Sequence, residues 1–141
     1  MDFTRLFEFV TNHWQLVGAF VGAVGGLVVH ETRKQGQSVN PAQVVKFVNQ
    51  SDAIIVDVRD TKEFRQGHIT GAQNIPFAEL KDRIPELEQQ KQQPVILVCG
   101  VGHYAGAAGK LLGQAGFKQV LRLSGGVGAW SAQGLPLVKA K

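Results

Sequence analysis

The chain contains a single cysteine, Cys99, which follows four apolar residues at 95–98 and precedes a run rich in small residues. The apolar run predicts a short strand that is buried on both faces. A helical pattern follows from Tyr104 to Ala115, with Gly116 as its C-cap. In this strand–loop–helix order, loop amides and the positive end of the helix dipole favour a thiolate over a thiol. Cys99 is therefore placed for nucleophilic sulfur chemistry.

Two interpretations of Cys99 are open at this point. Because the chain has no second cysteine, an internal disulfide cycle is excluded, and an outside acceptor must discharge any covalent intermediate. The alternative is that Cys99 is a small buried hydrophobic residue at the end of a core strand, since unpaired cysteines are among the most buried residue types.

A second group of polar residues, Asp57, Arg59 and Glu63, follows the apolar stretch 53–58. These residues could serve as acid, base and anion clamp. A carboxylate and a guanidinium this close in sequence more often form a bidentate pair that fixes a loop, and we favour that structural role. His68, between Gly67 and Ile69, is likewise predicted to be a turn residue bonded to the backbone.

The rest of the chain alternates predicted strands with predicted helices, a pattern that indicates an α/β fold with a parallel sheet. Asn40 and Pro41 form an N-cap and a first helical position. In the last helix, two glycines allow the backbone to pack beside the Cys99 loop, and Trp130 anchors it. The predicted strands are 53–58, 72–75, 95–98 and 120–123, and the predicted helices are 41–49, 104–115 and 124–130, with one or two short helices over 77–87.

Two stretches resemble the rhodanese family. Residues 98–117, VCGVGHYAGAAGKLLGQAGF, and 119–130, QVLRLSGGVGAW, are similar to its active-site half. Residues 57–76, DVRDTKEFRQGHITGAQNIP, match its other signature. The resemblance covers 39–137 and implies a rhodanese-like α/β domain, a small parallel sheet with helices on both faces. It also implies sulfurtransferase activity in which Cys99 carries a persulfide.

The usual rhodanese loop reads Cys-x-x-Gly-x-Arg-Ser. Here Cys99 and Gly102 match, whereas Tyr104 and Ala105 stand where arginine and serine are expected. The family's arginine helps to hold anionic sulfur donors, so its replacement argues against thiosulfate as the natural donor. The resemblance assigns substrate binding to the loop and bracing of the pocket rim to Asp57, Arg59 and Glu63. The loop residues are Gly100, Val101, Gly102, His103 and Tyr104, of which His103 could supply a positive charge when protonated.

The N-terminal segment predicts a membrane anchor. Residues 14–29 carry no charge, and apolar positions from Phe3 to Val10 can extend the helix towards the N-terminus. We expect an anchor over residues 1–30 with a span at about 13–29, a juxtamembrane linker at 31–38 and the rhodanese-like domain at 39–138.

Two other interpretations of this segment are a cleaved signal peptide and a buried soluble helix. Acidic Asp2 and Glu8 disfavour the signal peptide, and the glycine content disfavours the soluble helix. Arg33 and Lys34 follow the span, whereas only Arg5 precedes it, so the domain is expected on the cytoplasmic side of the inner membrane, with a single pass. Glycines at 18, 22 and 26 are a small-xxx-small pattern that raises self-association as a hypothesis.

Composition excludes several functional classes. The net charge of +4 is scattered, so no nucleic-acid partner is expected. Four histidines and one cysteine lack metal-ligand spacing, so neither a metal nor another cofactor is expected.

Two functions are therefore carried forward. The first is a membrane-anchored sulfurtransferase with a small sulfur donor, thiosulfate or a persulfide, and a thiol or other nucleophilic acceptor. The alternative is a weak or inactive rhodanese-like module that docks onto a membrane-protein complex. In both cases the N-terminal helix contacts membrane lipid.

Overall fold

The computed structural model describes residues 2–100 and 103–140, and the chain divides into two compact units, 1–33 and 34–141. The first unit contains two helices, α1 (Phe3–Asn12) and α2 (Trp14–Lys34). The prediction of one continuous helix from Phe3 was wrong, because His13 leaves the helical conformation at φ −123° and ψ 35°. Thr11, Asn12 and His13 are all weak helix formers, which explains a break at this point.

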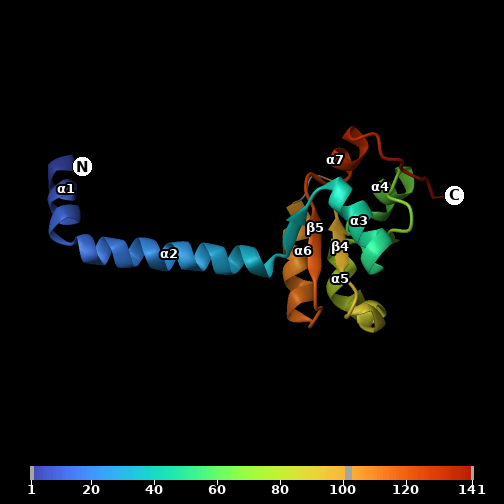
Figure 1. The fold of residues 1–141 in the computed structure, drawn as a ribbon, viewed down its shortest axis with the longest axis horizontal. Helices are drawn as coiled ribbons and strands as arrows, with labels where there is room; N and C mark the ends of the chain where they lie inside the picture. The colour runs from blue at the N-terminus through green and yellow to red at the C-terminus, as the bar shows by residue number, and fades with distance from the viewer. Residues whose placement is uncertain (1, 101–102, 141) are drawn as a thin grey trace. The chain divides into compact units, whose positions relative to one another are not determined.

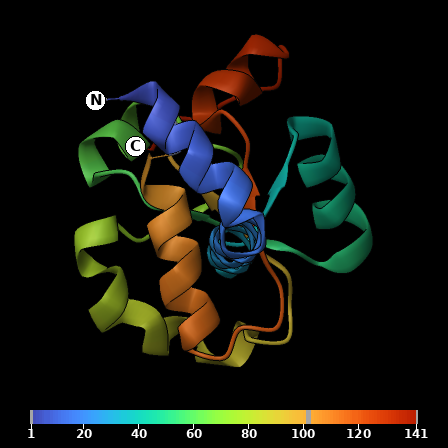
Figure 2. The same ribbon diagram turned by 90° about the vertical axis from the view of Figure 1, so that its left-hand side faces the viewer.

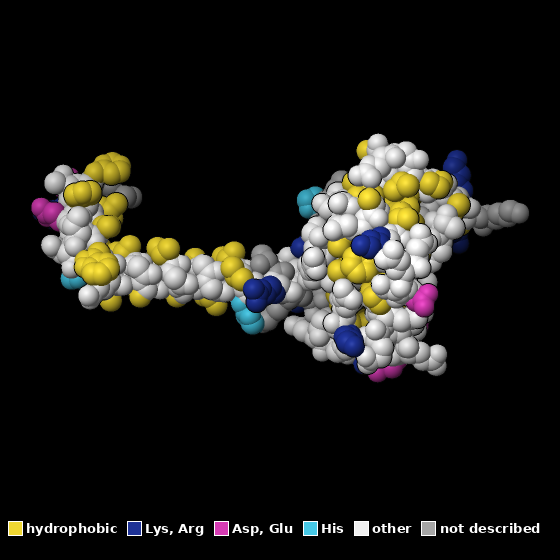
Figure 3. Space-filling view, in the orientation of Figure 1, with side chains coloured by type: hydrophobic (Ala, Val, Ile, Leu, Met, Phe, Trp, Pro, Cys, Tyr) yellow, Lys and Arg dark blue, Asp and Glu magenta, His cyan; other side chains and the backbone are white. Residues whose placement is uncertain are grey.

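The helix α2 includes an 18-residue window, Trp14–Glu31, that is long and apolar enough to cross a membrane, with a mean hydropathy of 1.2. Its large hydrophobic side chains are exposed along its length (Figure 3), among them Phe20 at 69% and Leu27 at 68%. Length and composition agree with the predicted span, while the identity of the membrane and the orientation of the helix stay predictions.

The second unit is built on a five-stranded sheet in the order β1-β5-β4-β2-β3, and every neighbouring pair is parallel. The parallel α/β architecture predicted from the sequence is therefore confirmed. The strands are β1 (Gln37–Val39), β2 (Ile54–Asp57), β3 (Gln73–Asn74), β4 (Val95–Val98) and β5 (Val120–Leu123).

Helices cover both faces of this sheet (Figures 1 and 2). One face packs against α3 (Pro41–Ser51) and α7 (Gly126–Ala132). The other packs against α5 (Phe77–Arg83), the 3₁₀ helix η1 (Ile84–Gln90) and α6 (His103–Gln114). A short helix, α4 (Thr61–Gln66), lies in the connection from β2 to β3.

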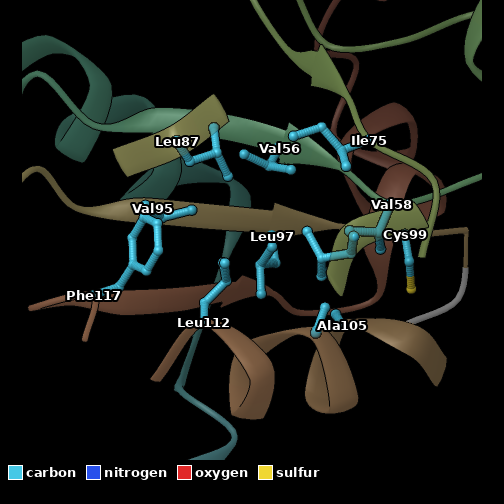
Figure 4. Packing of buried hydrophobic residues seen from close by; sticks show 12 residues of the cluster. Val56, Val58, Ile75, Leu87, Val95, Leu97, Cys99, Ala105, Leu112 and Phe117 are labelled. Atoms are coloured by element: carbon cyan, nitrogen blue, oxygen red, sulfur yellow. The ribbon is translucent and has the colours of Figure 1, made fainter. Parts of the chain in front are cut away.

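The central strand β4 is buried on both faces, as its uninterrupted apolar run predicts. Val95 and Leu97 belong to the cluster that packs against α6, and Ile96 and Val98 belong to the cluster on the opposite face. All four side chains are fully buried. The buried strand therefore places Cys99, the residue that follows it, against the hydrophobic core (Figure 4).

Capping at the start of α3 agrees with the sequence analysis. Asn40 accepts a bond from the Gln43 amide and its own amide donates to the Gln43 side chain, both at 2.9 Å, and Pro41 follows as the first helical residue. This reciprocal capping satisfies two backbone groups at the helix start.

The linker predicted at 31–38 is not a separate element. The helix α2 continues to Lys34, and Gln37–Val39 form β1, which pairs with β5 at the edge of the sheet. A three-residue strand with one buried side chain, Val39, has almost no periodic signal in the sequence. Its extended conformation comes from backbone pairing with β5, which is far away in the sequence.

Candidate active site

Cys99 lies directly after the carboxyl end of β4, where parallel α/β sheets commonly bind ligands. Its side chain is 2% exposed and packs in the cluster that includes Val58 and Ala105 (Figure 4). The Val58 amide donates a 2.9 Å hydrogen bond to the carbonyl of Val98, which joins the ends of β2 and β4. Burial alone agrees with both interpretations of Cys99, so the surroundings of the thiol must distinguish them.

The start of α7 packs closely on the Cys99 backbone, as the glycines of this segment predict. The Val127 amide donates a 2.9 Å hydrogen bond to the Cys99 carbonyl. Gly126 has φ +61°, and a Cβ atom at this position would lie 2.6 Å from the Gly100 carbonyl oxygen. Trp130 is 6% exposed and donates from Nε1 to the Pro136 carbonyl at 3.1 Å, which anchors the helix.

The predicted bidentate pair between Asp57 and Arg59 is present in the structure. Arg59 Nε lies 3.0 Å from Asp57 Oδ1 and 3.1 Å from Oδ2, and Nη2 lies 2.7 Å from Oδ2. The Asp57 side chain is fully buried and that of Arg59 is 9% exposed. The positive charge of this arginine is therefore paired inside the protein.

The same pair fixes the loop that follows β2. Arg59 Nη2 donates to the Gly67 carbonyl at 2.8 Å, and Asn74 Nδ2 donates to the carbonyls of Asp57 at 3.1 Å and Arg59 at 3.0 Å. The Arg59 Cδ atom lies 4.0 Å from the position of a Cβ atom on Gly100. Sequence reasoning missed Asn74, whose role depends on the pairing of β2 with β3.

A cavity of about 490 Å³ opens beside Cys99, between the start of α4, the start of α5 and the start of α6. Its walls include Arg59, Glu63, Phe77, Cys99, His103 and Tyr104. Gly100 also lines it, so three of the five predicted substrate-binding residues share this cavity with the cysteine. The other two, Val101 and Gly102, lie outside the described residues. Asp57 is buried beneath the rim.

An aromatic pair forms one wall of the cavity. The rings of Phe77 and Tyr104 stack with their centroids 5.2 Å apart and their planes at 24°. The Phe77 amide donates to the Val58 carbonyl at 3.0 Å, which holds the start of α5 against the end of β2. Tyr104 is 55% exposed. The sequence analysis did not identify Phe77 as a site residue. Its position directly after a predicted strand and Pro76 was a signal for a place near the carboxyl end of the sheet, where ligands bind.

The other wall carries acidic side chains at the start of α4. Asp60 occupies the N-cap position without making a side-chain capping bond, and Glu63 lies in the first turn. Both residues are exposed and line the cavity. Within the described part of the chain, neither side chain forms a hydrogen bond or an ion pair. His103, the exposed first residue of α6, lines the same cavity.

His68 holds the C-terminal segment and lies outside the cavity. Its Nδ1 is 2.9 Å from the Phe64 carbonyl oxygen, and its ring stacks on Phe64 with centroids 3.8 Å apart. His68 also forms a backbone bridge with Val138 through hydrogen bonds of 2.9 and 2.8 Å. The prediction of a structural, backbone-bonded histidine is confirmed.

Among the residues that the structure describes, no group of three or more histidine, cysteine or acidic side chains could hold a metal ion. Cys99 lines this cavity together with His103 and Tyr104, the first residues of the 12-residue helix α6, and the N-terminal end of a helix favours negative charge near it.

The family model for the rhodanese-like domain matches residues 40–133. The chain belongs to the rhodanese-like domain family. The matched region runs from α3 to α7, contains strands β2 to β5 and includes Cys99, Asp57 and Arg59.

Relatives of this rhodanese-like chain include uncharacterized proteins and sulfurtransferases. YibN of Escherichia coli K12, described as uncharacterized, is 34% identical over 97% of this chain and 99% of its own length. The thiosulfate sulfurtransferase GlpE of Pseudoalteromonas translucida is 31% identical over 67% of this chain and 88% of its own. A solved rhodanese-related protein from Thermoplasma volcanium has a TM-score of 0.67 and 28% identity, and covers 74% of this chain and 99% of its own.

Proposed function

We propose that this protein is a membrane-anchored rhodanese-like sulfurtransferase that carries a persulfide on Cys99. The observation that carries the proposal is the position of the cysteine. Cys99 follows a central buried strand, lines a cavity of about 490 Å³ and precedes the helix α6. Sulfurtransferase-named relatives support the same activity. A purely structural cysteine would not need a cavity beside its sulfur.

In the first half-reaction, the Cys99 thiolate attacks the outer sulfur of the donor. The sulfur–sulfur bond of the donor breaks as a new one forms to Cys99, and the donor leaves as sulfite from thiosulfate or as a thiolate from a persulfide. In the second, an acceptor thiolate attacks the outer sulfur on Cys99. The acceptor becomes a persulfide and the Cys99 thiolate is restored, so the cycle needs no external oxidant or reductant.

Residues around the cysteine hold this chemistry in place. The N-terminal end of α6 favours the negative charge of the thiolate and of the persulfide. The Val127 amide holds the Cys99 carbonyl, and the Arg59–Asp57 pair fixes the neighbouring loop that follows β2. A site held in this way needs little reorganisation during the reaction.

We also propose that α2 anchors the protein by a single pass in the inner membrane, with the domain in the cytoplasm. The apolar window Trp14–Glu31 supports the span, and Arg33 after it supports the orientation. A reducing compartment would keep the cysteine reduced.

Turnover tests the proposal. The full chain in detergent should transfer sulfur from a persulfide donor to cyanide or to a thiol, and Cys99→Ala should reduce this rate to that of buffer alone. Unchanged turnover in the variant would contradict the assignment of the persulfide to Cys99.

A docking module is the second candidate, because the half-exposed Tyr104 and its partner Phe77 present aromatic surface where the family has a cationic side chain. Crosslinking in native membranes separates the two functions. A docking module would lose its crosslinked partner in Tyr104→Ala and keep it in Cys99→Ala.

A further inference from the structure

The charge distribution of the Cys99 cavity points to a class of donor. Arg59 is the one arginine or lysine among the described residues of its wall, and its charge is paired with buried Asp57 at 2.7 Å. Its Nη2 also bonds to the Gly67 carbonyl. A guanidinium used in this way has little attraction left for an anion in the cavity.

The acids at the start of α4 add negative charge to the same cavity. Asp60 and Glu63 are exposed, line the wall and have no cationic partner within the described structure. Glu63 also borders a neighbouring hollow of about 390 Å³ with Arg59 and Gly100, so it lines both hollows. Like charges at the mouth of a cleft lower the local concentration of an anionic ligand and raise that of a cationic one.

The opposite wall is apolar and aromatic. Phe77 and Tyr104 stack there, and Pro76, Ala78 and Val58 add carbon surface. An aromatic face attracts cations and apolar groups, and the tyrosine hydroxyl is the side-chain hydrogen-bond donor within this stack, with His103 beside it in the same cavity lining.

We propose that this cavity selects an organic persulfide with a neutral or cationic carrier and discriminates against thiosulfate and anionic carriers. Asp60, Glu63 and Tyr104 are its specificity-determining residues. The inference rests on the proposed sulfurtransferase function and names its substrate class. The reaction is Cys99–SH + R–S–SH → Cys99–S–SH + R–SH. One sulfur–sulfur bond breaks and one forms, and the carrier R leaves as its thiol.

Three persulfides of nearly equal size test the proposal, with cysteamine, 2-mercaptoethanol or mercaptoacetate as carrier. Each is added to the full chain in a neutral detergent, and the gain of one sulfur is followed by quenched intact-mass analysis. The rate at which each donor loads Cys99 is divided by the rate at which the same donor reacts with a small uncharged thiol. This normalisation removes differences in the intrinsic reactivity of the donors. The cysteamine donor should load about tenfold faster than the mercaptoacetate donor, and salt should reduce this ratio.

Variants assign the preference to residues. The double variant Asp60→Asn with Glu63→Gln should lower the ratio severalfold. A matched control, Asp82→Asn with Glu88→Gln, removes the same charge from exposed positions of α5 and η1 and should leave the ratio unchanged. Tyr104→Arg should raise loading from mercaptoacetate persulfide and from thiosulfate.

The outcomes separate this inference from the function on which it rests. If no donor loads Cys99, the proposed sulfurtransferase function fails and the inference with it. If the three donors load at equal normalised rates, or if thiosulfate loads as well as the cysteamine donor, the sulfurtransferase function stands and the inference is overturned. The inference would also be overturned if the double variant of Asp60 and Glu63 left the ratio of cysteamine to mercaptoacetate loading unchanged.

Discussion

The Val127 amide donates a 2.9 Å hydrogen bond to the carbonyl of Cys99, the residue on which the proposed chemistry depends. The last helix therefore holds the backbone at Cys99. This contact depends on Gly126, which precedes Val127 and lies against the carbonyls of Cys99 and Gly100.

The variant Gly126→Ala should displace the Cys99 loop. A Cβ atom at this position would meet the Gly100 carbonyl at 2.6 Å, and φ is +61°, so the free energy of unfolding should fall by about 3 kcal/mol. Urea unfolding followed by Trp130 fluorescence in a Trp14→Phe background measures this loss. Gly134→Ala is the matched control, because φ is +71° but no atom lies within 4 Å, and it should cost about 1 kcal/mol. Equal losses in the two variants would contradict the proposed close packing.

Asp57→Asn should destabilise the fold by about 3 kcal/mol, because it leaves the Arg59 guanidinium nearly buried without its counter-charge. The double variant Asp57→Asn with Arg59→Met should recover part of this loss. A double-mutant cycle by urea unfolding of the full chain measures the coupling between the two residues. If the losses of stability in the two single variants simply add in the double variant, the ion pair does not fix the loop that follows β2.

Much of the fold could be predicted, because its signals are local. Four consecutive apolar residues at 95–98 predict a strand covered on both faces, and Asn40 with Pro41 predicts the start of α3. The strand β1 could not be predicted, since Gln37 and Ser38 have no strand signal and their conformation comes from pairing with β5. The break at His13 was also missed, because the apolar periodicity continues on both sides of it.

The site was predictable where sequence neighbours also interact in the structure. Asp57 and Arg59 are two residues apart and form the expected pair. Phe77 is far from Tyr104 in the sequence, and only the packing of α5 against α6 brings their rings together. Asp60 was overlooked because an acid before a helix ordinarily indicates a cap, and here its side chain makes no capping bond.

Membrane anchoring should depend on the first helical unit. The full chain should stay in the membrane pellet after alkaline carbonate extraction, and removal of residues 1–30 should release the protein, because the apolar window Trp14–Glu31 is lost. A C-terminal tag should be cleaved by protease in inverted inner-membrane vesicles and protected in intact spheroplasts. Protection in the inverted vesicles would contradict the cytoplasmic orientation, and extraction of the full chain by carbonate would contradict the span.

The most direct test of the central claim is intact-mass analysis of the full chain after incubation with a small organic persulfide, with Cys99→Ala alongside. The account predicts a gain of one sulfur atom in the wild type, its removal by cyanide or a thiol, and no gain in the variant, which retains the same tryptophan fluorescence. A wild-type chain that gains no sulfur from any of the persulfides, or a variant that gains as much as the wild type, would contradict the account.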